Sequence, residues 1–388
     1  MKIKQTMRFG TAVAALAVAV ANGAGAQIRK PPVKPGAPTA PSAPAAISVP
    51  ADPAAEPLTA RAAIRLTNPS RRVLALYYLW YGTPQKSGKW LHQDGVEAEK
   101  KSIASHAHFP ALGAYDSTDP AVIDKHLDQA KSAGIDTLVC SWWGRQDATD
   151  KALRALVAAA AGKGLTVAVM WEKLPGNRDA EAAAADLSYL METFGKQPGY
   201  LREGDRPVIF ALAPVCSALS ADQWATVLGD LATKSAPGVR IIGEGASQAD
   251  VLLWDGLQTL SYLPRMSERS PTVCARVQAD IYRVPILLGR AAGRISVVTL
   301  SPGCDDRKQS ARAGSKTSLV IEREEGGLYR ALWEQALRDS PDWVLINSFN
   351  QWHSGTEIEP SAEFGEQYLT LTRDFAARFK KSGSPVRK

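Results

Sequence analysis

The sequence has few cysteines, and none of them lies in a spacing typical of a metal site. Its 388 residues include four cysteines, Cys140, Cys216, Cys274 and Cys304. No Cys-x-x-Cys pair and no cysteine–histidine ligand spacing occurs, so we predict no metal and no cofactor. An oxidising compartment would permit disulfides, and Cys274 and Cys304, in or near expected loops, are the better pair. Cys140 lies in an apolar run and is expected to be a buried thiol.

The sequence also lacks an apolar segment of the about 20 residues that a membrane-spanning helix needs. The apolar run Thr11–Ala21 is shorter; three basic residues within the first eight precede it, and the small residues Ala24–Ala26 follow it. This order predicts a signal peptide over residues 1–26. We therefore expect a periplasmic or secreted protein without a membrane span in the mature chain; an uncleaved membrane anchor is the alternative.

A large excess of one charge is absent once the first residues are set aside. The formal net charge is +7, but residues 1–57 hold six of the 46 basic groups and two of the 39 acidic groups. The remaining 40 basic and 37 acidic groups make an ordinary mixed surface, without a basic stripe interleaved with aromatic residues. We therefore exclude nucleic acid as a partner.

Large apolar side chains are nearly absent from residues 27–57, where proline and alanine are frequent. Such a composition cannot bury enough surface to fold, so we predict an extended linker there. The remaining residues, 58–388, suffice for one large domain with a sizeable core.

From about Arg71 onwards, short apolar runs alternate with longer patterns of helical periodicity. Eight runs are expected strands: Val73–Leu79, Ile135–Trp142, Leu165–Glu172, Pro207–Leu212, Val239–Gly243, Leu257–Leu263, Ile295–Leu300 and Trp343–Phe349. Seven patterns are expected helices: Pro120–Ser132, Ala148–Lys163, Asp179–Phe194, Ala221–Thr233, Thr272–Leu288, Glu325–Arg338 and Ala362–Lys381. This alternation in one α/β domain predicts a (β/α)8 TIM barrel. A doubly wound open sheet is the alternative, but no Gly-x-Gly-x-x-Gly turn follows any strand.

Aromatic residues make up only 7% of the chain, yet several stand where expected strands end. In a parallel barrel these ends meet at one face, where active sites lie. Aromatic rings pack against the apolar faces of sugars, while carboxylates and amides bind the hydroxyl groups. The pattern predicts a carbohydrate site; tryptophans of the core are the alternative. The aromatic members of the expected site are Tyr78, Trp80, Tyr81, Trp143 and Tyr262.

The most informative stretch, the motif loop Asn347–Pro360, follows the apolar run Trp343–Ile346 and reads NSFNQWHSGTEIEP. It closely resembles the signature of the endo-α-mannosidases of glycoside hydrolase family 99, which typically reads Ser-Phe-Asn-Glu-Trp-His-Glu-Gly-Thr before an acidic segment. The resemblance covers most of the chain from about Val73 to Lys381. Further similar segments follow in the family's order: Tyr78–Gly82, Ile103–Ser105, Pro110–Pro120, Ala133–Ile135, Ser141–Trp143, Glu172 and Asn177–Asp179.

The resemblance implies an α-mannoside as substrate class and two glutamates that exchange protons during retaining endo-cleavage. Gln351 and Ser354 stand at the positions of these glutamates. An amide cannot take up a proton at useful pH, and a serine hydroxyl is too weak an acid to protonate a leaving oxygen. Asn350, Trp352 and His353 match the family and are expected to bind the ligand. We therefore predict an exported protein that binds an oligosaccharide or polysaccharide, with mannose-containing glycans as first candidates.

Two alternatives stay open. The first is an active glycoside hydrolase in which displaced carboxylates, those of Glu172, Glu357 or Glu359, take over proton transfer. For Glu357 and Glu359, a solvated loop is the opposing interpretation. The second alternative is a structural or assembly protein that keeps the barrel as a scaffold, and the fold alone cannot choose between these functions.

Overall fold

The computed structural model describes residues 56–66, 69–174, 176, 179–234, 238–260 and 262–383. The predicted signal peptide lies outside these residues, and so does the predicted linker apart from its last two positions. Asn177 and Arg178, which contribute to the family resemblance, lie outside them as well. The first described element is helix α1, Glu56–Ala63, so the folded domain begins two residues before the predicted boundary at residue 58.

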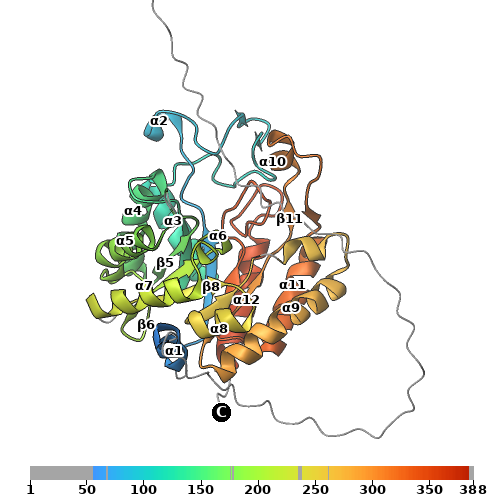
Figure 1. Cartoon of the computed structure of the whole chain (residues 1–388). Coiled ribbons are helices and arrows are strands. Elements are labelled where there is room, and N and C mark those ends of the chain that lie inside the picture. Colours follow the sequence, from blue (N-terminus) through green and yellow to red (C-terminus); the bar gives the residue numbers. More distant parts are fainter. Residues whose placement is uncertain are drawn as a thin grey trace, which may run out of the picture. The chain divides into compact units, whose positions relative to one another are not determined.

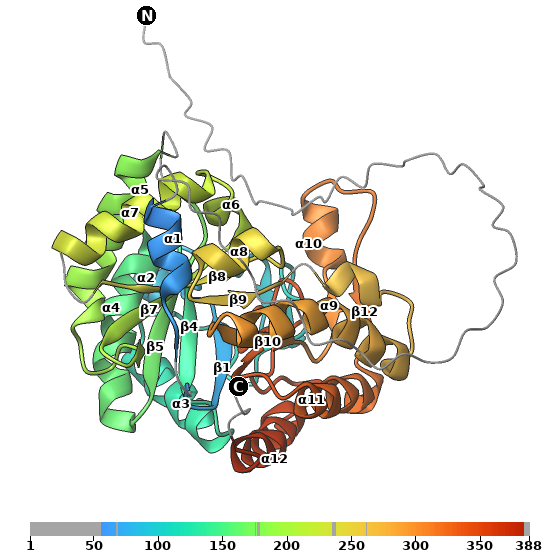
Figure 2. The ribbon, with the colours of Figure 1, turned by 60° about the horizontal axis from the view of Figure 1, so that its bottom comes forward.

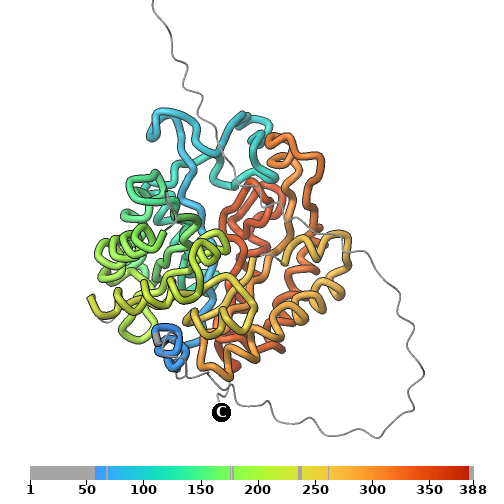
Figure 3. Tube along the Cα trace, in the orientation of Figure 1, coloured from blue at the N-terminus to red at the C-terminus, as the bar shows by residue number. Residues whose placement is uncertain are grey.

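Eight parallel strands of the described residues form a closed barrel (Figure 2). They are β1 (Arg72–Tyr77), β4 (Thr137–Trp142), β5 (Thr166–Trp171), β7 (Arg206–Ala211), β8 (Arg240–Glu244), β9 (Gly256–Gln258), β10 (Ile295–Leu300) and β13 (Trp343–Ile346). The chain passes once around the barrel, and β13 returns beside β1, where Arg72 pairs with Trp343 (Figure 3). Strand β5 also pairs with β7, so every barrel strand has a neighbour on both sides and the ring of strands is closed. The predicted TIM barrel is confirmed, and the open-sheet alternative is wrong.

Helices cover the outside of this barrel (Figure 1). They are α3 (Pro120–Ser132), α4 (Ala148–Lys163), α5 (Ala180–Leu190), α7 (Ala221–Lys234), α8 (Gln248–Leu253), α9 (Pro271–Ala291), α11 (Gly327–Asp339) and α12 (Gln367–Lys381). The bounds of α3 and α4 are those predicted, because capping residues mark them. Asp119 and Asp147 each accept a hydrogen bond from a backbone nitrogen of the first turn. Of these eight covering helices, α8 is the one without a counterpart among the seven predicted helices.

The core follows the two-residue alternation of the strands. In β1, Leu74 and Leu76 belong to the cluster inside the barrel, whereas Val73, Ala75 and Tyr77 face the helices. Successive side chains of a strand point to opposite faces, so each strand is buried on both sides. Among the larger inward side chains are Phe210 and Trp343, whose rings lie 6.2 Å apart.

Helix α1 packs against α7 and α8 at the amino ends of the strands, opposite the end where α2 (Pro84–Ser87) and α10 (Arg307–Arg312) lie (Figure 1). The guanidinium of Arg61 lies 2.7 Å from the carboxylate of Asp255, and both side chains are buried. Burial raises the pKa of Asp255, whereas Arg61 lowers it. The net result is a pKa below the usual value of an aspartate. This buried ion pair attaches the start of the domain to the barrel.

The four cysteines are free thiols. Cys274 and Cys304, the better candidate pair for a disulfide, are therefore not joined. Cys274 belongs to the first turn of α9, inside the helix predicted over Thr272–Leu288, and its thiol donates to the carbonyl of Met266 at 3.5 Å. Cys304 belongs to the short strand β11 (Cys304–Asp305). Cys140 is buried, as expected.

The described residues contain neither a membrane-spanning helix nor a cluster of metal ligands. In the part of the chain that the structure describes, no helix combines the length and the apolar character that crossing a bilayer requires. The same residues contain no group of three or more histidine, cysteine or acidic side chains placed to hold a metal ion.

Candidate functional site

Partly exposed polar and aromatic side chains gather where the barrel strands end. Tyr78 and Trp80 follow β1, Trp143 follows β4, Glu172 follows β5, and Glu244 is the last residue of β8. Parallel strands bring these positions to one end of the barrel, which we call the strand-end face. The motif loop follows β13 and reaches the same face, with Gln351 and Ser354 also partly exposed.

Three rings on this face form what we call the aromatic row: Trp143, Trp80 and His92. The ring centroids of Trp143 and Trp80 lie 6.3 Å apart. His92 stacks on Trp80 with a centroid distance of 4.7 Å and an interplanar angle of 9°. His92 covers one face of Trp80 and is itself exposed, so the outer ring of this pair is the histidine. Sequence reasoning missed His92, because it lies in the long loop between β1 and α3 and carries no motif.

Glu172 is the carboxylate of this face with the most altered acidity. It accepts a hydrogen bond from the Ser141 hydroxyl at 2.7 Å, and that hydroxyl in turn accepts one from the Trp143 indole at 2.9 Å. Burial raises the pKa of Glu172 to about 7; the Ser141 bond lowers it and the nearby Glu244 carboxylate raises it. At neutral pH this carboxyl group is divided between its two protonation states, so it can accept or donate a proton.

Glu244 has a different task at the same face. Its two carboxylate oxygens accept hydrogen bonds from the backbone nitrogens of Ala213 and Leu260, both at 2.9 Å. Ala213 is the first residue of the short helix α6 (Ala213–Cys216) after β7, and Leu260 follows β9. Glu244 therefore holds these two segments in place beside Glu172.

Asn350 fastens the motif loop to the chain that leaves β1. Its Oδ1 accepts from the Tyr78 backbone nitrogen at 2.7 Å, and its Nδ2 donates to the Tyr78 carbonyl at 3.1 Å. The Tyr81 hydroxyl donates to the Asn350 carbonyl at 2.8 Å. Asn350 and Tyr81 are buried, and their role as ligand-binding residues stays a prediction. They shape the face from below, because their polar groups bond to the protein itself.

Trp352 and Glu359 lie still deeper in the motif loop. Glu359 accepts from the Trp352 indole at 3.1 Å and from the Tyr115 hydroxyl at 2.9 Å, and its other oxygen lies 3.0 Å from His126 Nε2. Trp352 is fully buried and Glu359 is 3% exposed. Both side chains have their partners inside the protein, and the ligand contact of Trp352 and the catalytic role of Glu359 stay predictions.

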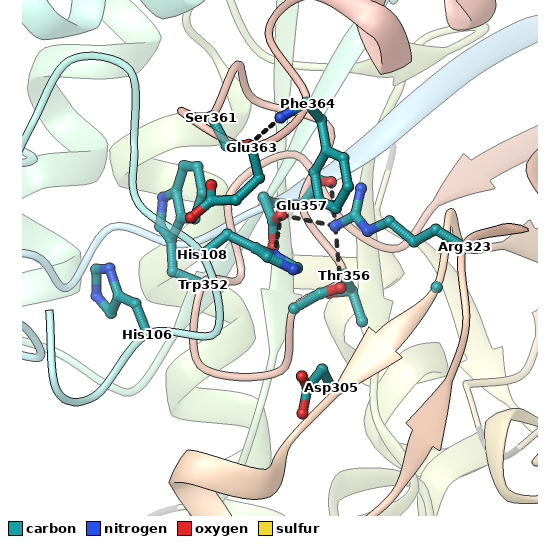
Figure 4. A network of polar contacts seen from close by, with 12 residues as sticks. His106, His108, Asp305, Arg323, Trp352, Thr356, Glu357, Ser361, Glu363 and Phe364 are labelled. Atoms are coloured by element: carbon teal, nitrogen blue, oxygen red, sulfur yellow. Dashed lines mark hydrogen bonds and ion pairs between the residues drawn. The ribbon is translucent and has the colours of Figure 1, made fainter. Parts of the chain in front are cut away.

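Glu357 belongs to a second buried network of hydrogen bonds and ion pairs (Figure 4). Its Oε1 lies 2.6 Å from Arg323 Nη2 and 2.8 Å from His108 Nδ1, and the side chain is 1% exposed. Arg323 lies between the rings of Phe364 and Tyr368, with 4.5 Å to each centroid. The solvated-loop interpretation of Glu357 and Glu359 is wrong, because burial and internal partners remove these carboxylates from solvent. The catalytic role of Glu357 stays a prediction.

Gln351 and Ser354 occupy neighbouring places at the surface of the motif loop. Gln351 Oε1 accepts a hydrogen bond from the Ser354 backbone nitrogen at 3.1 Å. The Ser354 hydroxyl lies 3.5 Å from Gln309 Oε1, which is a weak contact. The two positions that the family resemblance assigns to proton transfer therefore lie side by side, and neither carries an ionisable group.

His353 supports the aromatic row from below. Its Nε2 lies 3.0 Å from the His92 carbonyl, and His106 Nε2 lies at the same distance from that oxygen. Burial lowers the pKa of His353 to about 4 and that of His106 to about 3, with neighbouring histidines adding to the shift. His353 is 9% exposed and contacts the backbone of His92 as a neutral imidazole. Its direct contact with a ligand stays a prediction.

Tyr262 differs from the other predicted aromatic residues that follow a strand by its burial. It is 1% exposed and packs near Tyr282, with 6.3 Å between the ring centroids. Strand β9 ends at Gln258, earlier than predicted, and Tyr262 follows it in the chain; its ligand contact stays a prediction. The predicted residues that remain partly exposed at the strand-end face are Tyr78, Trp80, Trp143, Glu172, Gln351 and Ser354.

Comparisons with known proteins agree with this architecture. Residues 70–243 match the model of glycosyl hydrolase family 99. The chain is 25% identical to the glycoprotein endo-alpha-1,2-mannosidase of Mus musculus, over 79% of this chain and 74% of that protein. It is 27% identical to a glycoprotein endo-alpha-1,2-mannosidase-like protein of Danio rerio, over 79% and 77% of the two chains.

A solved structure shares the fold. The family 99 endo-alpha-mannosidase of Bacteroides thetaiotaomicron superposes with a TM-score of 0.65 at 23% identity, covering 81% of this chain and 99% of that one. The family model ends at residue 243, before the motif loop. The assignment of positions 351 and 354 therefore rests on the residues of the loop itself.

Proposed function

The chain belongs to glycosyl hydrolase family 99, and on this premise we propose that it is an exported glycan-binding protein that does not hydrolyse its ligand. Mannose-containing oligosaccharides or polysaccharides are the first candidate ligands. The proposal needs a face that can bind sugar and a motif loop that cannot transfer protons.

One observation carries the loss of hydrolysis. Gln351 and Ser354 stand at the two proton-transfer positions, and the loop's own carboxylates, Glu357 and Glu359, are buried in internal bonds. A retaining glycosidase needs two carboxyl groups that reach the scissile bond from the same site. The motif loop offers none at its surface, so its chemistry is limited to hydrogen bonding.

The aromatic row supports the binding half of the proposal. Trp143 and His92 present ring surface beside the hydrogen-bonding groups of Glu172 and Gln351. Rings next to a few polar groups are the usual composition of a sugar site. Calorimetric titration with α-mannan oligosaccharides, paired with a hydrolysis assay on the same samples, tests both halves.

A second candidate function, an active glycoside hydrolase, is favoured by Glu172. Its pKa of about 7 matches the range useful for a general acid or base, and Glu244 lies near enough to raise it. In this candidate, Glu172 would protonate the leaving oxygen. Hydrolysis of α-mannosides by the wild type that disappears in Glu172→Gln would establish it and would replace the non-hydrolytic proposal.

A further inference from the structure

Two exposed lysines are connected to the aromatic row. Lys173 directly follows Glu172; its Nζ lies 5.0 Å from the centroid of the Trp143 ring. Lys308 lies in α10, and its Nζ donates to the carbonyl of His106 at 2.6 Å. Lys173 follows β5, and α10 follows the short strand β11.

Direct contacts connect the two lysines. Lys173 contacts Trp143, Trp143 neighbours Trp80, and Trp80 stacks on His92. The carbonyl of His92 faces His106 Nε2 at 3.0 Å, and the carbonyl of His106 accepts from Lys308. The same α10 segment contributes Gln309, which touches Ser354. The lysines are therefore connected both to the row and to the replaced position at Ser354.

The charges of these lysines are not balanced locally. Among the described residues, neither lysine lies within 4.0 Å of a carboxylate, although neighbouring arginines do: Arg307 pairs with Asp305, and Arg312 with Asp94. Gln351 and Ser354, partly exposed on the motif loop, carry no negative charge. Glu172 is only partly ionised near neutral pH. Asp94 and Asp147 act electrostatically on His92, but neither contacts Lys173 or Lys308, so both ammonium groups can pair with an anionic ligand.

We propose that the glycan bound by this face is anionic, with carboxylate or phosphate groups that Lys173 and Lys308 contact beside the aromatic row. This inference rests on the proposed glycan-binding function and names its ligand class. An ammonium group is a compact charge that binds carboxylate or phosphate as a point charge, and the rings of the row bind the apolar sugar faces. The replacement of both family glutamates removes the repulsion that such a ligand would otherwise meet.

The test is a calorimetric comparison of three probes of similar length on the intact chain. They are a neutral α-mannan oligosaccharide, a phosphorylated mannan oligosaccharide and an oligogalacturonide; the two anionic probes separate phosphate from carboxylate recognition. The variants are Lys173→Ala, Lys308→Ala and their combination. Lys131→Ala removes an exposed charge from the last turn of α3 and is the matched control. Each titration is run at low salt and at about 0.5 M salt, where exposed charges are strongly screened.

We expect at least one anionic probe to bind more tightly than the neutral one at low salt and to lose this advantage at high salt. Each lysine variant should weaken anionic binding by up to about fivefold, the range of an exposed ion pair, and leave neutral binding unchanged. Equal binding of neutral and anionic probes, insensitive to both lysines, overturns the inference while the glycan-binding function stands. Binding of none of the three probes overturns the glycan-binding function and the inference with it.

Discussion

The side chain of Asn350 forms a pair of hydrogen bonds with the backbone of Tyr78: Oδ1 accepts at 2.7 Å and Nδ2 donates at 3.1 Å. The two residues are 272 positions apart in the chain, and the bonds join the motif loop to the segment that leaves β1. Because that segment also carries Trp80, this contact sets the place of the motif loop relative to the aromatic row.

Replacing Asn350 with Ala should lower the free energy of unfolding by about 2–4 kcal/mol, because two partly buried backbone groups of Tyr78 lose their partners. Urea denaturation measures this change directly. Gln309→Ala, which removes only the 3.5 Å contact with Ser354, is the control and should stay within about 0.5 kcal/mol of the wild type. A stable Asn350→Ala protein would show that the motif loop is held by other contacts.

Trp143→Ala should weaken glycan binding by about 1–3 kcal/mol through loss of a ring contact. Trp80→Ala should weaken it to a similar extent, by releasing the stacked His92 ring. Trp90, 37% exposed and outside the aromatic row, offers a matched control, since Trp90→Ala also removes an indole. Calorimetry measures all three, and equal losses in Trp90→Ala and Trp143→Ala would contradict a specific role for the row.

The pKa of Glu172, raised to about 7, makes stability depend on pH. Between about pH 4.5 and 7 the folded state holds a proton that the unfolded state has released, so this group's contribution to stability falls as the pH rises. Because the carboxyl group is partly exposed, we expect a loss of up to about 2 kcal/mol across this window. Glu172→Gln should flatten that part of the profile, as urea denaturation at several pH values would show. Parallel profiles for the two proteins would mean that Glu172 titrates normally.

Arg61→Ala should destabilise the domain by about 3–5 kcal/mol, because it leaves the buried Asp255 carboxylate without its closest partner. Arg65→Ala, on the same segment but without an ion pair among the described residues, is the control for a lost arginine. Thermal and chemical denaturation distinguish them. Equal, small effects would show that the segment before β1 contributes little to the folded domain.

The fold was predictable from sequence because its signals are local. The bounds of α3 and α4 follow from capping aspartates and periodicity within a few residues. The helix predicted over Thr272–Leu288 does match α9, which begins at Pro271. The end of strand β9 was not predictable in this way. The apolar pattern continues to Leu263, but the strand ends at Gln258, so Tyr262 lies after the strand and not within it.

The site was harder to predict because its bonds join distant segments. Residue types alone marked Glu357 and Glu359 as available acids, but their partners His108 and His126 lie 249 and 233 positions away. Nothing in the local sequence of His92, Arg323 or Gln309 indicates that they contact the motif loop. Residue type therefore identified the class of site, while burial and distant partners decided which side chains are free to act.

The central claim is that the motif loop keeps the family geometry and lacks only its proton-transfer groups. The double variant Gln351→Glu with Ser354→Glu tests it, with each single variant and the wild type assayed beside it on a fluorogenic α-mannoside. General acid and base groups contribute about 10²–10⁴-fold each and act as a unit, so one alone should achieve little. We predict measurable cleavage by the double variant and background rates for the other three proteins. Cleavage by the wild type, or a folded double variant that binds the substrate without cleaving it, would contradict the account.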